Sequence, residues 1–305
     1  MARIKLTVSE RVESIIFDTL NHILLIFLCI ATLYPFVNVI AVSLNDALDT
    51  VRGGIYLWPR KFTFYNYQRI FTSNENLLNA AFISASRAVV GSALSVVSNM
   101  ILAYTLSRKD FVLRKFFSKM LVYTMYFSGG IIPVYMLMRT LGLLNNFLVY
   151  ILPGMIGAYN VLVMRSYIDG IPTSFVEAAR IDGASEYRIL FTVIMPLCLP
   201  VMAVVVLFVG VGQWNSWFDT MLYCSTKPQL STLQYELQKI LMAARMMSEQ
   251  SDLMQQMGSQ GVSRTITPAA VRAAMTVIVV FPIMCLYPFL QRYFVSGLTL
   301  GGVKG

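Results

Sequence analysis

The chain has 305 residues, of which 57% are hydrophobic and only 13% charged, and its mean hydropathy is +0.65. Soluble domains average about 25% charged residues, so this composition excludes an ordinary soluble domain and indicates a protein that crosses a membrane several times. The formal net charge is +9, but the basic residues are scattered over short segments between apolar runs. This distribution argues against a nucleic-acid-binding face.

Apolar runs of membrane-spanning length divide the chain. We expect six helices, at 23–44, 77–106, 120–138, 146–164, 196–218 and 269–289. Residues 1–20 alternate charged and apolar side chains, which predicts a short interfacial amphipathic segment or a frayed terminus. The predicted fold class is an all-α polytopic membrane protein with one domain.

Prolines and glycines inside these runs predict bent or broken helices, because proline removes a backbone donor. Pro35 lies in the first run and Pro282 and Pro288 lie in the last. The third run contains Gly129, Gly130 and Pro133, and the fourth contains Pro153, Gly154 and Gly157. We expect the third and fourth helices to be bent or broken.

The segments between the runs predict the orientation. Residues 107–119 hold five basic side chains, namely Arg108, Lys109, Arg114, Lys115 and Lys119, and the single acid Asp110. A short segment this basic marks the cytoplasmic side. Alternation then places 1–20, 165–194 and 291–305 in the cytoplasm. Residues 45–76, which are polar and aromatic, become an external loop. Residues 223–266, expected to form an amphipathic helix and then a flexible part, become another.

The second run is rich in Ser, Ala, Gly and Asn, a composition typical of a helix that packs on other helices. It also contains Arg87, the one charge near the middle of a predicted span. We favour a structural interpretation of Arg87, either snorkelling or packing against helix carbonyls. Contact with a transport pathway or a partner subunit is the alternative.

Residues 177–196, which we call the elbow, form a polar island between two apolar runs. Ala178 and Ala179 favour a helix, and Gly183 can adopt the left-handed conformation that ends one. Residues 186–191 can then start a second short helix. Pro196 suits the start of the following apolar helix, where a missing N–H is tolerated. The sequence therefore predicts a helix–turn–helix with a small tip, suited to docking in a groove.

The elbow resembles the EAA loop of ABC importer permeases. That pattern is Glu-Ala-Ala, three residues, Gly, nine residues and Ile-x-Leu-Pro, and it places Glu177, Gly183 and Pro196 in register. Val193 and Met195 replace the family's Ile and Leu. Residues 291–305 are similar to the tail of maltose-transporter-type sugar permeases (carbohydrate uptake family 1), so the resemblance extends over nearly the whole chain.

The resemblance implies a type I importer permease in a prokaryotic cell membrane, paired with a second homologous permease, two ATPase subunits and an extracytoplasmic sugar-binding protein. The ATPase-coupling residues that it implies are Glu177, Ala178, Ala179, Arg180, Asp182 and Gly183. This chain contains no Gly-x4-Gly-Lys-Ser/Thr phosphate loop. We therefore expect no enzymatic activity, cofactor or metal here, with ATP and Mg²⁺ bound by the separate ATPase.

A sugar path needs aromatic faces beside amides and carboxylates. The end of the fifth run and the third run offer such side chains, at Gln213, Trp214, Asn215, Trp217 and Asp219 and at Tyr126. Helical spacing predicts that Gln213 shares a face with Trp217, and Asn215 with Asp219. An interfacial belt is the alternative role for the tryptophans.

Two other functions stay open: an ion-coupled secondary carrier, and a membrane enzyme or scaffold that uses the loop 45–76. A carrier would bury carboxylates or histidines at mid-membrane, and the predicted spans have none near their centres. The only histidine, His22, lies at a span edge. Dependence on ATP and co-purification with an ATPase would separate the three functions.

Overall fold

The computed structural model describes residues 8–73, 75–256 and 268–299. These residues form helices, and their only β-type pairing is an isolated antiparallel bridge between Asn45 and Phe62. The predicted all-α fold class is confirmed. The elements are α1 (Val8–Ser43), α2 (Ala47–Thr50), α3 (Tyr65–Ser73), α4 (Leu77–Ser107), α5 (Arg114–Tyr126), α6 (Ile131–Thr140), η1 (Phe147–Tyr150), η2 (Leu152–Gly154), α7 (Ala158–Asp169), α8 (Ser174–Ile181), α9 (Glu186–Arg188), η3 (Ile189–Ile194), α10 (Met195–Leu197), α11 (Leu199–Asn215), α12 (Phe218–Tyr223), η4 (Pro228–Leu230), α13 (Leu233–Gln256) and α14 (Pro268–Thr299).

The chain divides into two compact units, one made of residues 1–73 and 240–278 and the other of residues 74–239 and 279–305. The elbow and all the residues expected to line a sugar path belong to the second unit. The single permease domain stays a prediction.

In the first unit, α1 is continuous from Val8 to Ser43, and the side chains of residues 14–37 are all exposed. Apolar side chains exposed on every face of a helix suit a lipid environment. The helix includes residues 8–20 without a break, and the interfacial position expected for 1–20 stays a prediction. Residues 1–7 lie outside the described part.

Buried polar side chains fix the chain that follows α1. The Asn45 amide donates to the Asp49 carboxylate at 3.1 Å, and Arg60 forms an ion pair with the same carboxylate at 3.0 Å. The hydrogen bond from Asn45 and the charge of Arg60 lower the pKa of Asp49, although burial opposes them. Asn66 donates to the carbonyl oxygens of Ser43 and Asn45. These bonds hold the loop, whose Trp58 side chain is exposed.

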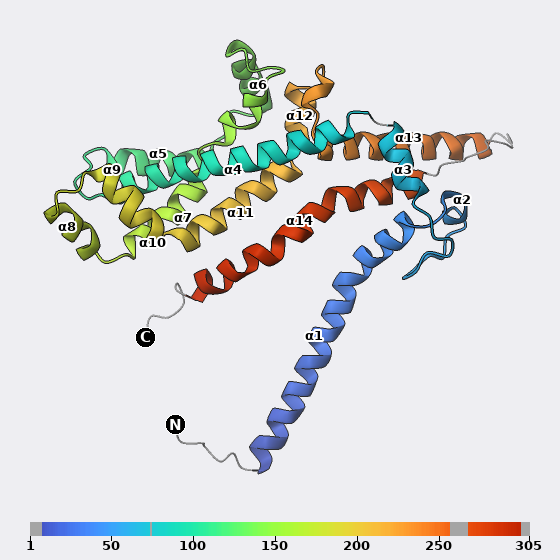
Figure 1. Ribbon diagram of the computed structural model, residues 1–305, viewed down its shortest axis with the longest axis horizontal. Coiled ribbons are helices and arrows are strands. Elements are labelled where there is room, and N and C mark those ends of the chain that lie inside the picture. The colour runs from blue at the N-terminus through green and yellow to red at the C-terminus, as the bar shows by residue number, and fades with distance from the viewer. Residues whose placement is uncertain (1–7, 74, 257–267, 300–305) are drawn as a thin grey trace. The chain divides into compact units, whose positions relative to one another are not determined.

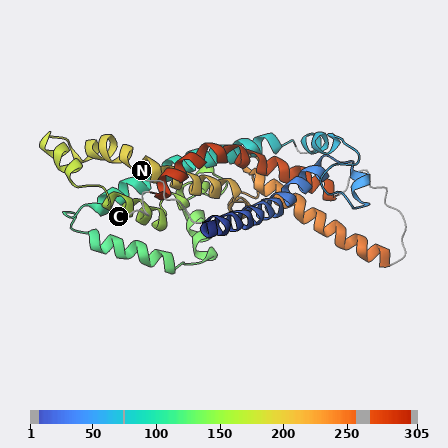
Figure 2. The same ribbon diagram turned by 90° about the horizontal axis from the view of Figure 1, so that it is seen from below.

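The second unit is organised around α4, which runs beside α11 and α7 (Figures 1 and 2). Their contacts form the main hydrophobic core, in which small and medium side chains interlock. Its fully buried members include Met100, Ala103, Leu106, Val161, Met164, Ile189, Ile194 and Cys198. Half of the most apolar stretch of α4 is buried, so the prediction that this helix packs on other helices is confirmed.

Among the described residues, two unbroken stretches are long and apolar enough to cross a membrane, Ser14–Ser43 and Leu77–Ser107. Three further pairs qualify only as bent spans. They are Arg114–Tyr126 with Ile131–Thr140 at 118°, Phe147–Gly154 with Ala158–Asp169 at 50°, and Glu186–Leu197 with Leu199–Asn215 at 82°. The bends expected in the third and fourth helices are confirmed.

The third bend was not predicted, and prolines account for it. Pro196 lies in the first turn of α10, directly after the π-helical stretch η3, and Pro200 lies in the first turn of α11. Neither proline can donate to the preceding turn, so the helix is interrupted between them at Cys198. The long apolar helix therefore begins at Leu199 and not at Pro196.

Two helices extend beyond their expected ends. Helix α13 continues to Gln256, so residues 245–256, expected to be flexible, are helical. Residues 257–267 lie outside the described part. Helix α14 runs through the expected end of the last span at 289 as far as Thr299. Its apolar part, within the described side chains, is the shorter stretch Ala269–Cys285, and the count of six spans stays a prediction.

Candidate functional site

The elbow is a short helix, a tight turn and a second helical stretch. Helix α8 ends at Ile181, and Gly183 then adopts a left-handed conformation with φ of 76°. The Ala184 N–H donates to the Ala179 carbonyl and the Gly183 N–H to the Arg180 carbonyl, each at 3.0 Å. These two bonds define a Schellman motif. The predicted left-handed glycine and the restart of a helix at Glu186 are both confirmed.

The elbow extends beyond the end of α4 in both views (Figures 1 and 2). Glu177, Ala178, Asp182 and Gly183 are exposed, and Ala179 is half-buried against the core. This surface also has an apolar component that was not predicted. Ile181 at the end of α8 is 86% exposed, and Tyr187 is also largely exposed.

Arg180, the remaining residue of the expected coupling set, faces its own chain. Its guanidinium pairs with Glu186 at 2.7 Å and with Asp110 at 3.4 Å. The other oxygen of Glu186 accepts a 2.6 Å hydrogen bond from the Tyr104 hydroxyl. Hydrogen bonding to Glu186 and its charge raise the pKa of Arg180. We call Tyr104, Asp110, Arg180 and Glu186 the tether.

A second polar cluster surrounds Arg87, which is 2% exposed. Its guanidinium donates to Gln213 Oε1 at 2.8 and 3.0 Å and forms an ion pair with Asp219. It also donates to the Ser216 carbonyl at 3.4 Å and lies over the Tyr150 ring at 4.4 Å. Snorkelling is wrong for Arg87, because its side chain is buried, and of the expected carbonyl packing only the Ser216 contact is present. Its main partners are two side chains expected in a sugar path, which were not foreseen.

Gln213 reaches Arg87 because α4 has a glycine opposite it. A Cβ at Gly91 would lie 3.1 Å from Gln213 Nε2, so a larger residue would push the amide aside. The same amide donates to the Tyr150 carbonyl at 3.1 Å. Gln213 therefore joins α4, η1 and α11.

The expected helical spacing across 213–219 is wrong. Helix α11 ends at Asn215, Ser216 is extended with ψ of 125°, and α12 begins at Phe218. The extended residue turns its carbonyl toward Arg87 and brings Asp219 to the same guanidinium. A break in the helix, and not a shared helical face, brings these residues together.

The other residues expected to line a sugar path have different surroundings. The Trp214 indole N–H donates to the Val279 carbonyl of α14 at 3.0 Å, and Trp217 packs edge-on against Phe218 with ring centroids 5.8 Å apart. Asn215 is exposed. Tyr126 is exposed at the last position of α5.

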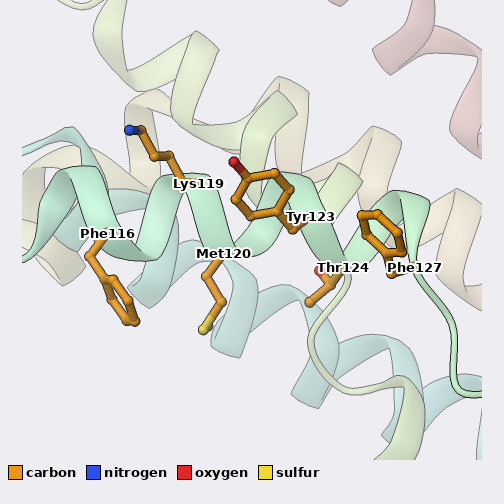
Figure 3. A pocket seen from close by; sticks show the side chains of 6 residues that line it. All are labelled: Phe116, Lys119, Met120, Tyr123, Thr124 and Phe127. Carbon is orange, nitrogen blue, oxygen red and sulfur yellow. The ribbon is translucent and has the colours of Figure 1, made fainter.

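Helix α5 carries an open groove of about 370 Å³ (Figure 3). Its lining residues are Phe116, Lys119, Met120, Tyr123, Thr124 and Phe127. In Figure 3 the Lys119 amine and the Tyr123 hydroxyl point to one side of the helix, and Phe116 and Met120 to the other. All six residues come from one helix or its end, so the groove is a lateral surface and not an enclosed binding site.

We expect Arg87→Met to destabilise the protein by about 3 kcal/mol, because it leaves the Asp219 carboxylate without its partner. Replacing both partners, in Arg87→Met with Asp219→Leu, should recover part of the loss. Thermal unfolding in detergent measures both effects. Arg139→Met, at an exposed arginine of α6, is the matched control, and equal melting temperatures for Arg87→Met and Arg139→Met would contradict the assignment.

At Gly183, an added Cβ meets no atom within 4 Å, so a substitution acts through the backbone alone. We expect Gly183→Ala to cost about 1 kcal/mol and Gly183→Val to cost more, because β-branched residues avoid positive φ. Gly212→Ala is the control, since a Cβ at Gly212 would also meet no atom within 4 Å but this glycine lies inside helix α11. Thermal unfolding of the three variants checks this, and a wild-type result for Gly183→Val would show that the turn does not need glycine.

Comparison with known proteins agrees with this architecture. Residues 80–299 match the family "Binding-protein-dependent transport system inner membrane component". The chain is 33% identical to the polygalacturonan/rhamnogalacturonan transport system permease protein YtcP of Bacillus subtilis, over 95% of this chain and 99% of that protein. It is 29% identical to the arabinooligosaccharides transport system permease protein AraQ of Halalkalibacterium halodurans, over 92% and 94%.

A solved structure gives the same result for the fold. The crystal structure of a bacterial ABC transporter involved in the import of the acidic polysaccharide alginate superposes with a TM-score of 0.77, at 28% identity, and covers 96% of this chain and 100% of that chain. The family match over residues 80–299 includes both the elbow and the Arg87 cluster. The chain therefore belongs to the family of binding-protein-dependent transport system inner membrane components, the permeases of ABC importers.

Proposed function

We propose that this chain is one permease subunit of an ATP-driven importer for an oligosaccharide. The elbow carries this proposal, since it is a compact tip with small residues and a left-handed glycine, located beyond the end of the helix around which its unit packs. Relatives named for the transport of polygalacturonan and arabinooligosaccharides support the substrate class.

The complete importer would contain a second homologous permease, two ATPase subunits that bind ATP and Mg²⁺, and an extracytoplasmic sugar-binding protein. This chain would span the cell membrane of a prokaryote with six helices, with both termini and the elbow in the cytoplasm. The basic segment 107–119 supports that orientation, because short cytoplasmic segments are enriched in Lys and Arg.

Within the elbow, Glu177 is our candidate for a charged contact with the ATPase. It is exposed, whereas the neighbouring Arg180 already has two carboxylate partners within its own chain. Ile181 and Tyr187 add exposed apolar area beside it. Apolar anchors with a charged residue at their rim are typical of protein–protein interfaces.

For the sugar path we propose the junction of α11 and α12. Asn215 is exposed and Trp217 is half-buried, so both could contact a passing sugar through an amide and an aromatic face. Gln213 and Asp219 would act with their oxygens oriented by Arg87. Trp214 and Tyr126 complete the proposed set.

The test of the proposed function is co-purification of the ATPase with the tagged chain, together with ATP-dependent uptake into proteoliposomes. Oligogalacturonides, arabino-oligosaccharides and alginate oligosaccharides are the probes. Glu177→Ala should weaken ATPase binding by about 2–5 kcal/mol if the interfacial pair is desolvated. Glu75→Ala, at an exposed carboxylate outside the elbow, is the control. A wild-type chain that binds no ATPase would refute the proposal.

Uptake measured against assembly yield tests the sugar path. We expect Trp217→Ala and Asn215→Ala to lower uptake about tenfold, the equivalent of roughly 1.4 kcal/mol of lost sugar contact, with the importer still assembled. Trp214→Phe removes the donor to Val279 and tests whether that residue acts as an anchor. A parallel loss of yield and uptake in Trp217→Ala and Asn215→Ala would reject the path and leave structural anchors.

A further inference from the structure

The elbow has a specific connection to α4. Tyr104 is 5% exposed, near the last turn of α4, and its hydroxyl donates to Glu186 at the start of α9. Glu186 in turn accepts from Arg180 of α8. One carboxylate thus joins both arms of the elbow to the helix around which the second unit packs.

This connection contributes little to folding stability by itself. The side chains of Arg180 and Glu186 are 44% and 49% exposed, and ion pairs so accessible to water are worth little. Their geometry is nevertheless well defined. Arg180 also pairs with Asp110, which lies between α4 and α5, and the Arg108 guanidinium lies over the Tyr104 ring at 4.6 Å.

Helix α4 links the tether to the proposed sugar path. It is unbroken from Leu77 to Ser107, so Tyr104 and Arg87 lie about 25 Å apart along one rigid helix, at 1.5 Å per residue. Arg87 holds Gln213, Ser216 and Asp219 at the junction of α11 and α12. A displacement of α4 at Tyr104 therefore reaches that junction through hydrogen-bonded contacts.

A groove of about 390 Å³ lies beside the tether, lined in part by Ile101, Thr105 and Tyr187. On this open side the hydrogen bonds of Glu186 connect the elbow to α4. On the other side Val176, Ile189 and Leu190 pack in the same hydrophobic core as Tyr104 and Leu106, so the tether adds a polar connection to an apolar one.

We propose that Tyr104, Arg180 and Glu186 are positioning residues that transmit movement of the elbow to α4 and through Arg87 to the α11–α12 junction. This inference rests on the proposed function, in which the elbow docks on an ATPase. It assigns Arg180 to the connection within the chain and leaves Glu177 for the contact with the partner.

The experiment measures a distance between spin labels on Ser174→Cys, at the start of α8, and Leu94→Cys, on the exposed side of α4. The complete complex with bound ATPase is used, with and without MgATP. The exposed Cys29 and Cys285 are replaced by serine, while Cys198 and Cys224 are buried. In the wild type we expect the distance to stay the same on adding MgATP, because both labels move together.

In Glu186→Gln and Tyr104→Phe we expect MgATP to shift this distance while the ATPase remains bound. Arg188→Gln, at an elbow arginine outside the tether, is the matched control and should behave as the wild type.

Each other outcome overturns the inference. A distance that stays constant in Glu186→Gln and Tyr104→Phe, with ATPase bound, would show that the tether is not needed. A distance that shifts in the wild type would show that the elbow slides over α4. Loss of ATPase from the wild-type complex would instead refute the proposed function, so the two failures are distinguishable.

Discussion

Every break in a membrane-embedded helix exposes backbone N–H and C=O groups that lipid cannot satisfy. In this protein polar side chains of α4 bond backbone groups at two such interruptions, after α11 and before α7, and also in the segment before α13. The bonds run from Asn79 to the Gln229 carbonyl, from the Leu233 N–H to Ser84, from Arg87 to the Ser216 carbonyl, and between Asn99 and both the Met155 carbonyl and the Gly157 N–H. The second unit depends on these bonds, because without them backbone N–H and C=O groups would be buried unpaired, at a cost in folding free energy.

This role explains the composition of α4. Its small residues let neighbouring helices approach, and its polar residues reach the places where those helices end or turn. Asn99 is an example. Its fully buried amide donates to the Met155 carbonyl and accepts from the Gly157 N–H, so it satisfies backbone groups on both sides of the turn before α7. The unbroken helix is therefore the polar one, and the more uniformly apolar α11 is the one that follows a bend.

Local features of the fold could be predicted from the sequence. Gly183 ends a helix because only glycine adopts positive φ without strain, and that requirement is visible in a few residues. The partners of Arg87 could not be predicted, since Gln213 and Asp219 lie 126 and 132 residues away along the chain. The extended Ser216 was missed for a related reason, because its carbonyl accepts a hydrogen bond from the distant Arg87 guanidinium.

The difference between local features and long-range contacts also applies to the charges of the elbow. Glu177 and Arg180 are three residues apart on one helix, and the sequence alone gives both the same role. Their surroundings differ because Arg180 meets Glu186 across the turn that Gly183 forms, a spacing of six residues that no single helix brings together. The left-handed glycine thus shapes the tip and also folds Glu186 back toward α4 and Tyr104. Charge in an exposed loop is for this reason not a reliable guide to contact with a partner, since part of it holds the loop to its own protein.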